Sequence, residues 1–552
     1  MSTFRRLLHT LLSFSLLATL LAWPPAAPPA QAAGLISGTV YQDYNANGTQ
    51  DAASANPNAG AGTYSAAIDT GLGNVTVTAY DASGAFVSTV TAISGTYTLD
   101  TAGLGVGPYR VEFTNLPAGY QPGPFGADNG TTVRIVDGNT SGVDLGLNYP
   151  ADYCQDNPQL AVPCYVKGDQ LTGPNRFQSV LESFPYSSGS NGAVISAYDN
   201  PLVHTFVISA TQIGTTWGLA QTRYPQRLFA AAYMKKHTGF GPGGPGAVYV
   251  IDRLTATVVA TYTVPGAVTD PHNPANYQTD NGNVTWNAVG KVSLGGLAMS
   301  DDETRLYVMN LENRTLYALD PATGAVLASQ AVPLNPPLGA GTCPAGDVRP
   351  FAVEFYHGGL YVGMLCTAES SQNAANLQAY VYSVDPLTLA FGAAPAFQAA
   401  LNYPRGRANG GPTGQLAAWN PWAPTFRALP PNIGDPSWDF PVYPQPLFTS
   451  LSFMNGDLVI GLRDRFGDQT GNRAPDNEAD FGALYHGITA GDTLLACANG
   501  SGGWTLESNG RCGTPPRGSA PQDTGQGPGS GALAPLGYGE FFFTDDYSVP
   551  TN

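Results

Sequence analysis

The sequence predicts an all-β protein, built as a β-sandwich followed by a β-propeller. Only 11% of its residues are charged, and it is rich in turn formers, with 67 Gly and 46 Pro. Short runs rich in Val, Thr and Tyr recur along the chain and are separated by Gly, Asn, Asp and Pro. A weak internal repeat then appears in the larger C-terminal part, as expected of an architecture with repeated blades.

The N-terminal residues have the layout of a secretory signal peptide. Arg5 and Arg6 form a short positive segment, and residues 7–23 are largely apolar with no Asp, Glu, Lys or Arg. Residues 30–32 then read Ala-Gln-Ala, a typical cleavage pattern, so residues 1–32 are predicted to be removed. An uncleaved anchor is the alternative, but polar residues make the apolar run a weak membrane span. Contact with the membrane is expected only through this signal segment.

Residues 33–149 are predicted to form the sandwich. Seven strand-like runs without helical periodicity occur there, at the spacing typical of two packed antiparallel sheets. The runs are 36–41, 75–80, 86–91, 96–99, 109–113, 132–136 and 143–147. A change of character over residues 149–156, where the first cysteine appears, marks the end of this domain.

Residues 150–552 are predicted to form the propeller. Strand-like runs that end in Asp recur at residues 247–252, 315–320 and 379–385, and a turn and another strand follow each one. Paired strand-like runs precede each of them, and a further pair, at residues 448–453 and 458–462, begins a fourth repeat. Four strands per repeat are typical of a β-propeller. A large double-sheet sandwich is the alternative.

The number of repeats is low for a closed propeller. Besides the four repeats, only fragments at residues 205–210 and 540–548 look like further strands, and open sheet edges are a liability. We therefore expect the propeller to be incomplete at its C-terminal end and the chain to be part of a longer protein. A stop codon directly after Asn552 would contradict this expectation.

Six cysteines fall into three pairs that are close in sequence. In an exported protein disulfides are the natural interpretation, although six cysteines allow fifteen pairings. Proximity favours Cys154 with Cys164, Cys343 with Cys366, and Cys497 with Cys512. No C-x-x-C spacing is present, which argues against a zinc or thioredoxin-like site.

The net charge of −17, with only 23 Lys and Arg, argues against a nucleic-acid-binding protein. Backbone binding needs clustered basic residues, and no basic stripe is present. An acidic surface instead favours cations and solubility, and a soluble secreted surface without a ligand is the alternative. With the export signal, we expect a secreted or cell-surface protein, with an extracellular protein or glycan as its partner.

The sharpest local motif fits the start of a calcium loop, D-x-[DN]-x-[DN]-G. Oxygen-bearing side chains at alternate positions converge on one hard cation, and a glycine makes the sharp turn. An EF-hand would supply a Glu at the twelfth position, where Ser54 stands, and a strand rather than a helix precedes the motif. An Asx-rich turn without metal is the alternative. The candidate ligands are Asp43, Asn45, Asn47, Thr49 and Asp51.

The region around this motif resembles the SdrD B-type domain of bacterial surface proteins, which is itself similar to the collagen-adhesin B-type sandwich. The resemblance covers residues 34–149 and rests on GTVYQDYNANG from Gly38, GNVTVTAYD from Gly73, GTYTL from Gly95 and LPAGY from Leu116. It implies an Ig-like or prealbumin-like sandwich that calcium stabilises and that acts as a stalk or spacer. The family has an acidic residue soon after the motif; here residues 52–68 intervene, and Asp69 takes that position.

The propeller region offers weak candidates for chemistry. Neither H-E-x-x-H nor G-x-S-x-G occurs. His237 lies in a Gly-rich loop and could face a propeller channel, with a surface turn as the alternative. Asp464, Arg465 and Asp468 follow a strand in an apparent polar loop, where a carboxylate pair could bind a cation or act on sugars. A solvated, internally paired loop is the alternative there.

Residues 228–241 and 463–468 are similar to the propeller-like region that follows B-type domains in long exported bacterial proteins, a resemblance that implies no activity. We therefore assign no catalytic residue. The predicted function is that of a secreted or cell-surface bacterial protein with a calcium-stabilised domain, acting in adhesion, in ligand binding or as a surface structural module. The alternative is a secreted hydrolase or lyase with its site in the propeller channel.

Overall fold

A computed structural model describes residues 34–43, 50, 69, 71–123, 130–149, 158–186, 206–222, 227–300, 303–356, 358–405, 417–427, 442–454, 456–470, 472–474, 485–499, 503–508 and 512. The predicted signal peptide and the strand fragment at residues 540–548 lie outside them. The described residues separate into two compact units, one ending at residue 149 and the other beginning at residue 158. Among the described helices, none has the length and apolar character that crossing a bilayer requires.

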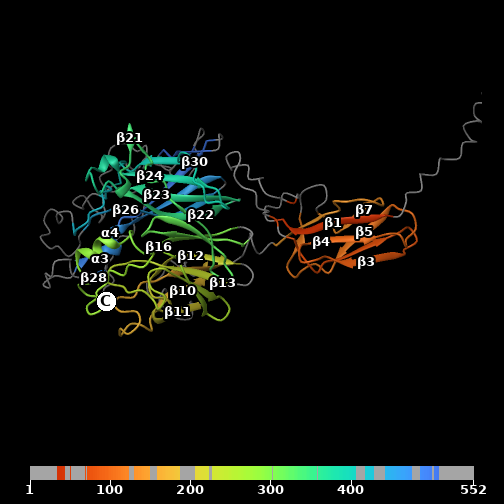
Figure 1. Ribbon diagram of the computed structural model, residues 1–552, viewed down its shortest axis with the longest axis horizontal. Coiled ribbons are helices and arrows are strands. Elements are labelled where there is room, and N and C mark those ends of the chain that lie inside the picture. Colours follow the sequence, from red (N-terminus) through yellow and green to blue (C-terminus); the bar gives the residue numbers. More distant parts are fainter. Residues whose placement is uncertain are drawn as a thin grey trace, which may run out of the picture. The chain divides into compact units, whose positions relative to one another are not determined.

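The first unit is a β-sandwich of two four-stranded sheets, drawn in red to orange in Figure 1. One sheet has the strand order β4-β1-β8-β6 and the other β3-β2-β5-β7. The strands are β1 (Leu35–Gln42), β2 (Thr76–Tyr80), β3 (Phe86–Val90), β4 (Thr96–Asp100), β5 (Tyr109–Thr114), β6 (Gln121–Pro122), β7 (Val133–Val136) and β8 (Leu145–Asn148). All seven predicted strands are confirmed, and the two-residue β6 is an addition.

Strict alternation of side chains fills the space between these sheets. In β5, Tyr109, Val111 and Phe113 are buried while the residues between them are half-buried or exposed. Tyr97 of the opposite sheet meets Phe113 edge to face at 5.8 Å. Its hydroxyl donates to the carbonyl oxygen of Val143 at 2.6 Å, so this polar group is satisfied inside the core.

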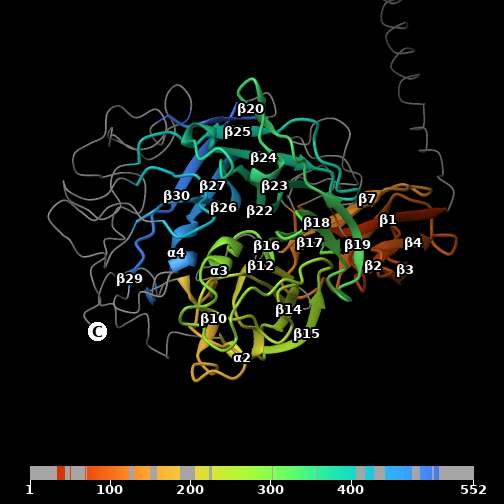
Figure 2. The same ribbon diagram turned by 60° about the vertical axis from the view of Figure 1, so that its left-hand side comes forward.

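The second unit is a β-propeller of five sheets. A three-stranded sheet comes first, with the order β11-β10-β9, and four four-stranded sheets follow: β12-β13-β14-β15, β16-β17-β18-β19, β22-β23-β24-β25 and β26-β27-β30-β31. Figure 2 shows β12, β16, β22 and β26 near the middle of this unit and β15, β19 and β25 toward its outside. Two short hairpins, β20-β21 and β28-β29, extend from the sheets.

The strands of the propeller are β9 (Gln159–Pro163), β10 (Ser179–Pro185), β11 (Phe206–Ser209), β12 (Thr216–Thr222), β13 (Arg227–Ala232), β14 (Ala247–Asp252), β15 (Thr257–Thr263), β16 (Leu294–Met299), β17 (Leu306–Asn310), β18 (Thr315–Leu319), β19 (Val326–Ala331), β20 (Pro337–Leu338), β21 (Gly341–Thr342), β22 (Val348–Tyr356), β23 (Gly359–Cys366), β24 (Gln378–Val384), β25 (Phe397–Ala400), β26 (Pro446–Met454), β27 (Asp457–Asp464), β28 (Asn472–Ala474), β29 (Tyr485–His486), β30 (Asp492–Ala498) and β31 (Trp504–Leu506). The short helices are α2 (Ala210–Ile213), α3 (Asn283–Ala288), η4 (Ala345–Asp347), η5 (Ala374–Asn376) and α4 (Arg465–Thr470).

The internal repeat of the sequence corresponds to the turn between the third and fourth strands of a sheet. The Oδ1 atoms of Asp252, Asp320 and Asp385 each accept from the backbone N–H groups two and three residues ahead, at 2.8–3.0 Å. Such Asx turns mimic a backbone turn and fix the strand reversal. Gly324, at the end of one of them, has a φ of 74°, and a Cβ there would lie 2.3 Å from the ring of Tyr262.

Neighbouring sheets pack through shared apolar clusters. One cluster contains Leu181 of the first sheet and Tyr249 of the second, and another contains Val248 of the second and Val308 of the third. Between the third and fourth sheets, Tyr307 stacks on Phe355 at 5.7 Å. A further cluster joins the fourth sheet to the fifth.

A side-chain contact links the fifth sheet to a segment that follows a strand of the first sheet. The guanidinium carbon of Arg463, on β27, lies 5.7 Å from the ring centroid of Tyr165, just after β9. The four predicted repeats are confirmed as the last four sheets. The first sheet is an addition, since only its strand near residues 205–210 was anticipated.

Two of the three predicted disulfides are confirmed. Cys343 and Cys366 are bonded with a Cα–Cα distance of 5.8 Å, and Cys497 and Cys512 with one of 5.4 Å. Cys164 is half-buried, and its predicted partner Cys154 lies outside the described residues. The third pairing therefore stays a prediction.

Candidate functional site

Residues of all five sheets line a partly open cavity of about 450 Å³, here called the axial cavity. Residues of β9, β12, β16, β22 and β26 line it, together with Tyr165 and Arg463. Its apolar side chains are Val162, Pro163, Leu219, Leu297, Val353 and Leu451, and its polar or amphipathic ones are Tyr165, Trp217, Glu354, Thr449, Ser450 and Arg463. A mostly apolar wall with a few polar groups is the usual composition of a small-molecule site.

Glycines let the inner strands approach each other around this cavity. A Cβ on Gly218 of β12 would lie 2.4 Å from the carbonyl oxygen of Gly295 on β16. A Cβ on Gly296 would lie 2.8 Å from the backbone nitrogen of Val353 on β22. Because only glycine fits at such close backbone contacts, these positions fix the width of the cavity.

An ionic cluster stands at the wall of the axial cavity and is centred on the buried carboxylate of Asp468. Arg463 donates to it from Nε at 2.8 Å and from Nη2 at 2.7 Å. Lys235 Nζ donates at 2.8 Å and the Tyr233 hydroxyl at 2.9 Å. Burial alone would raise the pKa of Asp468, but the adjacent Arg463 and Lys235 hold it well below its ordinary value.

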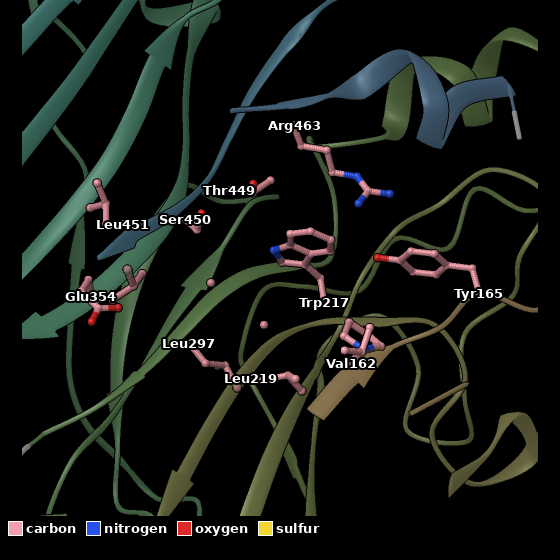
Figure 3. Close-up of a pocket in the computed structure, with 14 residues that line it drawn as sticks. Val162, Tyr165, Trp217, Leu219, Leu297, Glu354, Thr449, Ser450, Leu451 and Arg463 are labelled. Atoms are coloured by element: carbon pink, nitrogen blue, oxygen red, sulfur yellow. The ribbon is translucent and has the colours of Figure 1, made fainter. Parts of the chain in front are cut away.

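Two aromatic rings that line the axial cavity contact the cations of this cluster. The Arg463 guanidinium carbon lies 4.7 Å from the ring centroid of Trp217, and Lys235 Nζ lies 5.0 Å from that of Tyr165. Figure 3 shows Arg463 above Trp217 and the Tyr165 hydroxyl pointing toward Trp217. That hydroxyl is buried and has no hydrogen-bond partner among the described residues, and burial raises the pKa of Tyr165.

A second cavity of about 370 Å³, here called the side cavity, adjoins the first. The two share Trp217, Thr449, Ser450 and Arg463, and residues of the paired strands β27 and β30 also line the side cavity. Asp464 and Asp492 both line it. Asp464 and Asp492 are thus the carboxyl groups of the side cavity, while Glu354 lines the axial cavity.

The two carboxyl groups of the side cavity differ in their hydrogen bonds. Asp464 accepts from three backbone N–H groups, at 2.9, 2.9 and 3.0 Å, and burial raises its pKa to about 7. The Oδ2 of Asp492 accepts from the Tyr403 hydroxyl and from Arg405 Nε. Its Oδ1 is buried and has no partner within the described part of the chain, and burial raises the pKa of Asp492 to about 6.

The prediction that Asp464, Arg465 and Asp468 lie in a polar loop is wrong. Residues 465–470 form α4, and all three candidates are buried because each has partners elsewhere in the fold. Arg465 donates to the carbonyl oxygens of Val289 at 2.9 Å and Asn287 at 3.0 Å. Asp464 accepts from backbone N–H groups, whereas Asp468 accepts from the side chains of Arg463, Lys235 and Tyr233.

His237 is neither a surface residue nor part of the two cavity walls. It is buried at a φ of 68°, its Nδ1 lies 2.9 Å from the carbonyl oxygen of Tyr277, and its backbone N–H donates to Asp280 at 2.8 Å. Burial lowers its pKa to about 3. A buried, neutral imidazole bonded to the backbone indicates a structural role, so the expectation that His237 faces the channel is wrong.

The residues that make the axial cavity distinctive were missed by the sequence analysis. Trp217 was recognised only as part of a strand, and Tyr165 was not singled out. Arg463 was noted only as part of a resemblance. The available signal was a tryptophan beside a glycine in an innermost strand, which places a large ring at the propeller axis.

Of the predicted calcium ligands, Asp43 and Asp69 are described, and both are buried. Tyr41 forms an isolated antiparallel bridge with Gly71, so Asp43 and Asp69 each lie two residues from a bridged position near one end of β1. The other predicted ligands, Asn45, Asn47, Thr49 and Asp51, lie outside the described residues, within which no cluster of three or more His, Cys, Asp or Glu occurs.

No protein-family model matches the chain. The chain is 27% identical over 539 residues to colossin-A of Dictyostelium discoideum, a match that covers 92% of this chain and 4% of that protein. It is 26% identical over 537 residues to colossin-B of the same organism, covering 93% of this chain and 12% of that protein. The chain thus spans only a small part of these relatives, and their source does not support the bacterial origin that the resemblance implied.

Similar solved structures include a nidogen/laminin complex, at 9% identity and a TM-score of 0.27, covering 55% of this chain and 88% of that one. Another is a quinohemoprotein alcohol dehydrogenase from Comamonas testosteroni, at 14% identity and a TM-score of 0.24, covering 54% and 37%. Scores this low carry no argument about function.

Proposed function

We propose that this chain is an exported binding protein whose propeller holds a small ligand in the axial cavity. The observation that carries the proposal is the convergence of all five sheets on one cavity of about 450 Å³. Pockets of this size and composition bind small ligands in many folds. The ring of Trp217 supplies contact area, and the nearby Arg463 and Ser450 supply polar groups.

Export is supported by the covalent structure. Disulfides persist in oxidising compartments and are rare in the cytosol, and two of them lie in the propeller. The predicted signal peptide accounts for the route, and a secreted or cell-surface location follows from both features.

The sandwich would act as a stalk or spacer stabilised by calcium, as its resemblance to the SdrD B-type domain implies. Asp43 and Asp69 would hold the ion together with the oxygen-bearing residues of the motif. Binding would tie the end of β1 to the segment after the insertion, and its binding energy would add to the stability of the folded domain. The expected partner, an extracellular protein or glycan, would place a small group in the axial cavity.

A plugged cavity tests the binding proposal. Leu219→Trp places a large side chain into the axial cavity, and Leu254→Trp makes the same change at an exposed turn residue. In a thermal-shift screen of sugars, organic acids and amino acids, we expect compounds that stabilise the wild type and the Leu254→Trp variant but not Leu219→Trp. A screen without any stabilising compound, or a plugged variant that keeps the full shift, would overturn the proposal.

A secreted hydrolase or lyase is the second candidate, favoured by Asp492. A carboxyl group with a pKa near 6 and one buried oxygen without a partner in the described chain is suited to general acid catalysis in the side cavity. Turnover of a glycan by the wild type that disappears in Asp492→Asn, with ligand binding retained, would support this candidate.

A further inference from the structure

We infer that the axial cavity selects a ligand bearing a carboxylate, which would lie against Arg463 with the Tyr165 hydroxyl as a second donor. The inference rests on the proposed function, because it names the chemical class of the ligand in the same cavity. The charge at one wall, the unused donors beside it and the apolar surface opposite them each support it.

The ionic cluster leaves a positive charge in excess at the cavity wall. Lys235 and Arg463 each carry one positive charge, and Asp468 supplies the single negative charge that they share. The side chain of Lys235 is only 12% exposed and that of Arg463 is 31% exposed, so water screens this excess only in part. An anion placed there would gain more than it would at an open surface.

Arg463 also keeps hydrogen-bonding capacity on the cavity side. Its Nε and Nη2 are both used by Asp468, which leaves Nη1 for another acceptor. Figure 3 shows the guanidinium group above Trp217, on the side of the cavity where Tyr165 also lies. A carboxylate is the acceptor that a guanidinium group binds best.

The Tyr165 hydroxyl points to the same acceptor. Buried hydroxyl groups nearly always have a partner, and this one has none among the described residues, although Lys235 and Arg463 both lie near its ring. A ligand oxygen beside Arg463 would supply that partner.

The remainder of the cavity selects the skeleton that carries the carboxylate. Leu219, Leu297 and Val353 form an apolar surface, and Glu354 lies across the cavity from Arg463 in Figure 3. The apolar surface would accept a ring or another compact skeleton at that end. The ligand class is therefore a carboxylic acid on such a skeleton.

Isothermal titration calorimetry on the full chain tests this inference with two acids and their neutral counterparts. The pairs are D-glucuronate with D-glucose, and benzoate with benzamide; they distinguish a sugar acid from an apolar acid. We expect one acid to bind at least about tenfold more tightly than its neutral counterpart. Equal affinity within both pairs would overturn the inference but leave the proposed function standing. The inference would also be overturned if neither acid bound.

Two conservative variants test the two donors. Tyr165→Phe removes only a hydroxyl without a partner in the described chain, so it should fold, and we expect it to weaken acid binding about fivefold to tenfold. Tyr380→Phe is the matched control, because its hydroxyl donates to the carbonyl oxygen of Pro337 outside the cavity. Arg463→Lys keeps the charge but loses the planar donor group. We expect this variant to show a smaller preference for the acid over its neutral counterpart than the wild type does. Unchanged selectivity in both Tyr165→Phe and Arg463→Lys would overturn the assignment.

Discussion

Replacing Asp468 by asparagine should strongly destabilise the propeller. The carboxylate is fully buried and accepts two hydrogen bonds from Arg463, one from Lys235 and one from Tyr233. Asparagine would keep a single acceptor oxygen and would place its own N–H groups against these donors. Two cations would then remain close together without a compensating charge.

The expected loss in the free energy of unfolding depends on how far the side chains of Lys235 and Arg463 are exposed. Removing one member of a buried ion pair costs about 3–5 kcal/mol, because the remaining charge stays buried. Lys235 cannot reach water easily, but the side chain of Arg463 is 31% exposed and can turn outward. We therefore expect a loss near the lower limit, about 3 kcal/mol.

Urea unfolding followed by tryptophan fluorescence measures this loss. Of the 7 tryptophans, all except Trp23 lie between residues 217 and 504, so the signal reports on the propeller. Asp385→Asn is the control, because asparagine can form the same Asx turn that Asp385 forms. The control should lose less than about 1 kcal/mol.

The pH dependence provides an independent check. The pKa of Asp468 is lower in the folded state than in the unfolded chain, so its contribution is present above about pH 4 and is lost as the pH falls. Asp468→Asn should therefore lose less stability on acidification than the wild type does. Two results would refute the stabilising role of this cluster. One is a loss below about 1 kcal/mol at neutral pH, and the other is a variant that loses as much stability on acidification as the wild type does.

Three further predictions concern other parts of the chain. Cys343→Ala with Cys366→Ala opens a loop whose ends are 23 residues apart and should lower the free energy of unfolding by about 2–4 kcal/mol in urea titration; an unchanged midpoint would contradict it. Asp464 has a pKa of about 7 in the folded state, so the folded protein binds more protons than the unfolded chain between about pH 4 and 7, and its contribution to stability should fall as the pH rises through that window. Asp464→Asn should remove this part of the slope, and parallel pH profiles of the two proteins would show the prediction to be wrong. Chelation should lower the melting temperature of the sandwich, and a calorimetric transition unaffected by chelator would exclude calcium there.

Much of the fold could be predicted from local sequence patterns. Alternating residues identified the sandwich strands, because one face of each sheet must be buried. The repeated aspartates identified three propeller sheets, because the same Asx turn recurs in Asp252, Asp320 and Asp385. Sequence proximity also gave the disulfides between Cys343 and Cys366 and between Cys497 and Cys512.

The first sheet of the propeller and the site could not be predicted in the same way. The strands β9 and β10 lie in a part of the chain without the repeated Asp turn, and they join the propeller through contacts with later sheets. Charged residues usually indicate exposure, but Asp468 and Arg465 are buried because distant partners satisfy them. Lys235 meets Asp468 across more than 200 residues of sequence, a pairing that no local pattern reveals.

A crystal structure of the chain with its best-binding compound tests the central claim, that the axial cavity is a ligand site. The compound would be the one that gives the largest thermal shift in the wild type and no shift in Leu219→Trp. We predict electron density for it between Trp217, Leu297 and Arg463. Density for the compound at another surface, with only water at the propeller axis, would contradict the claim.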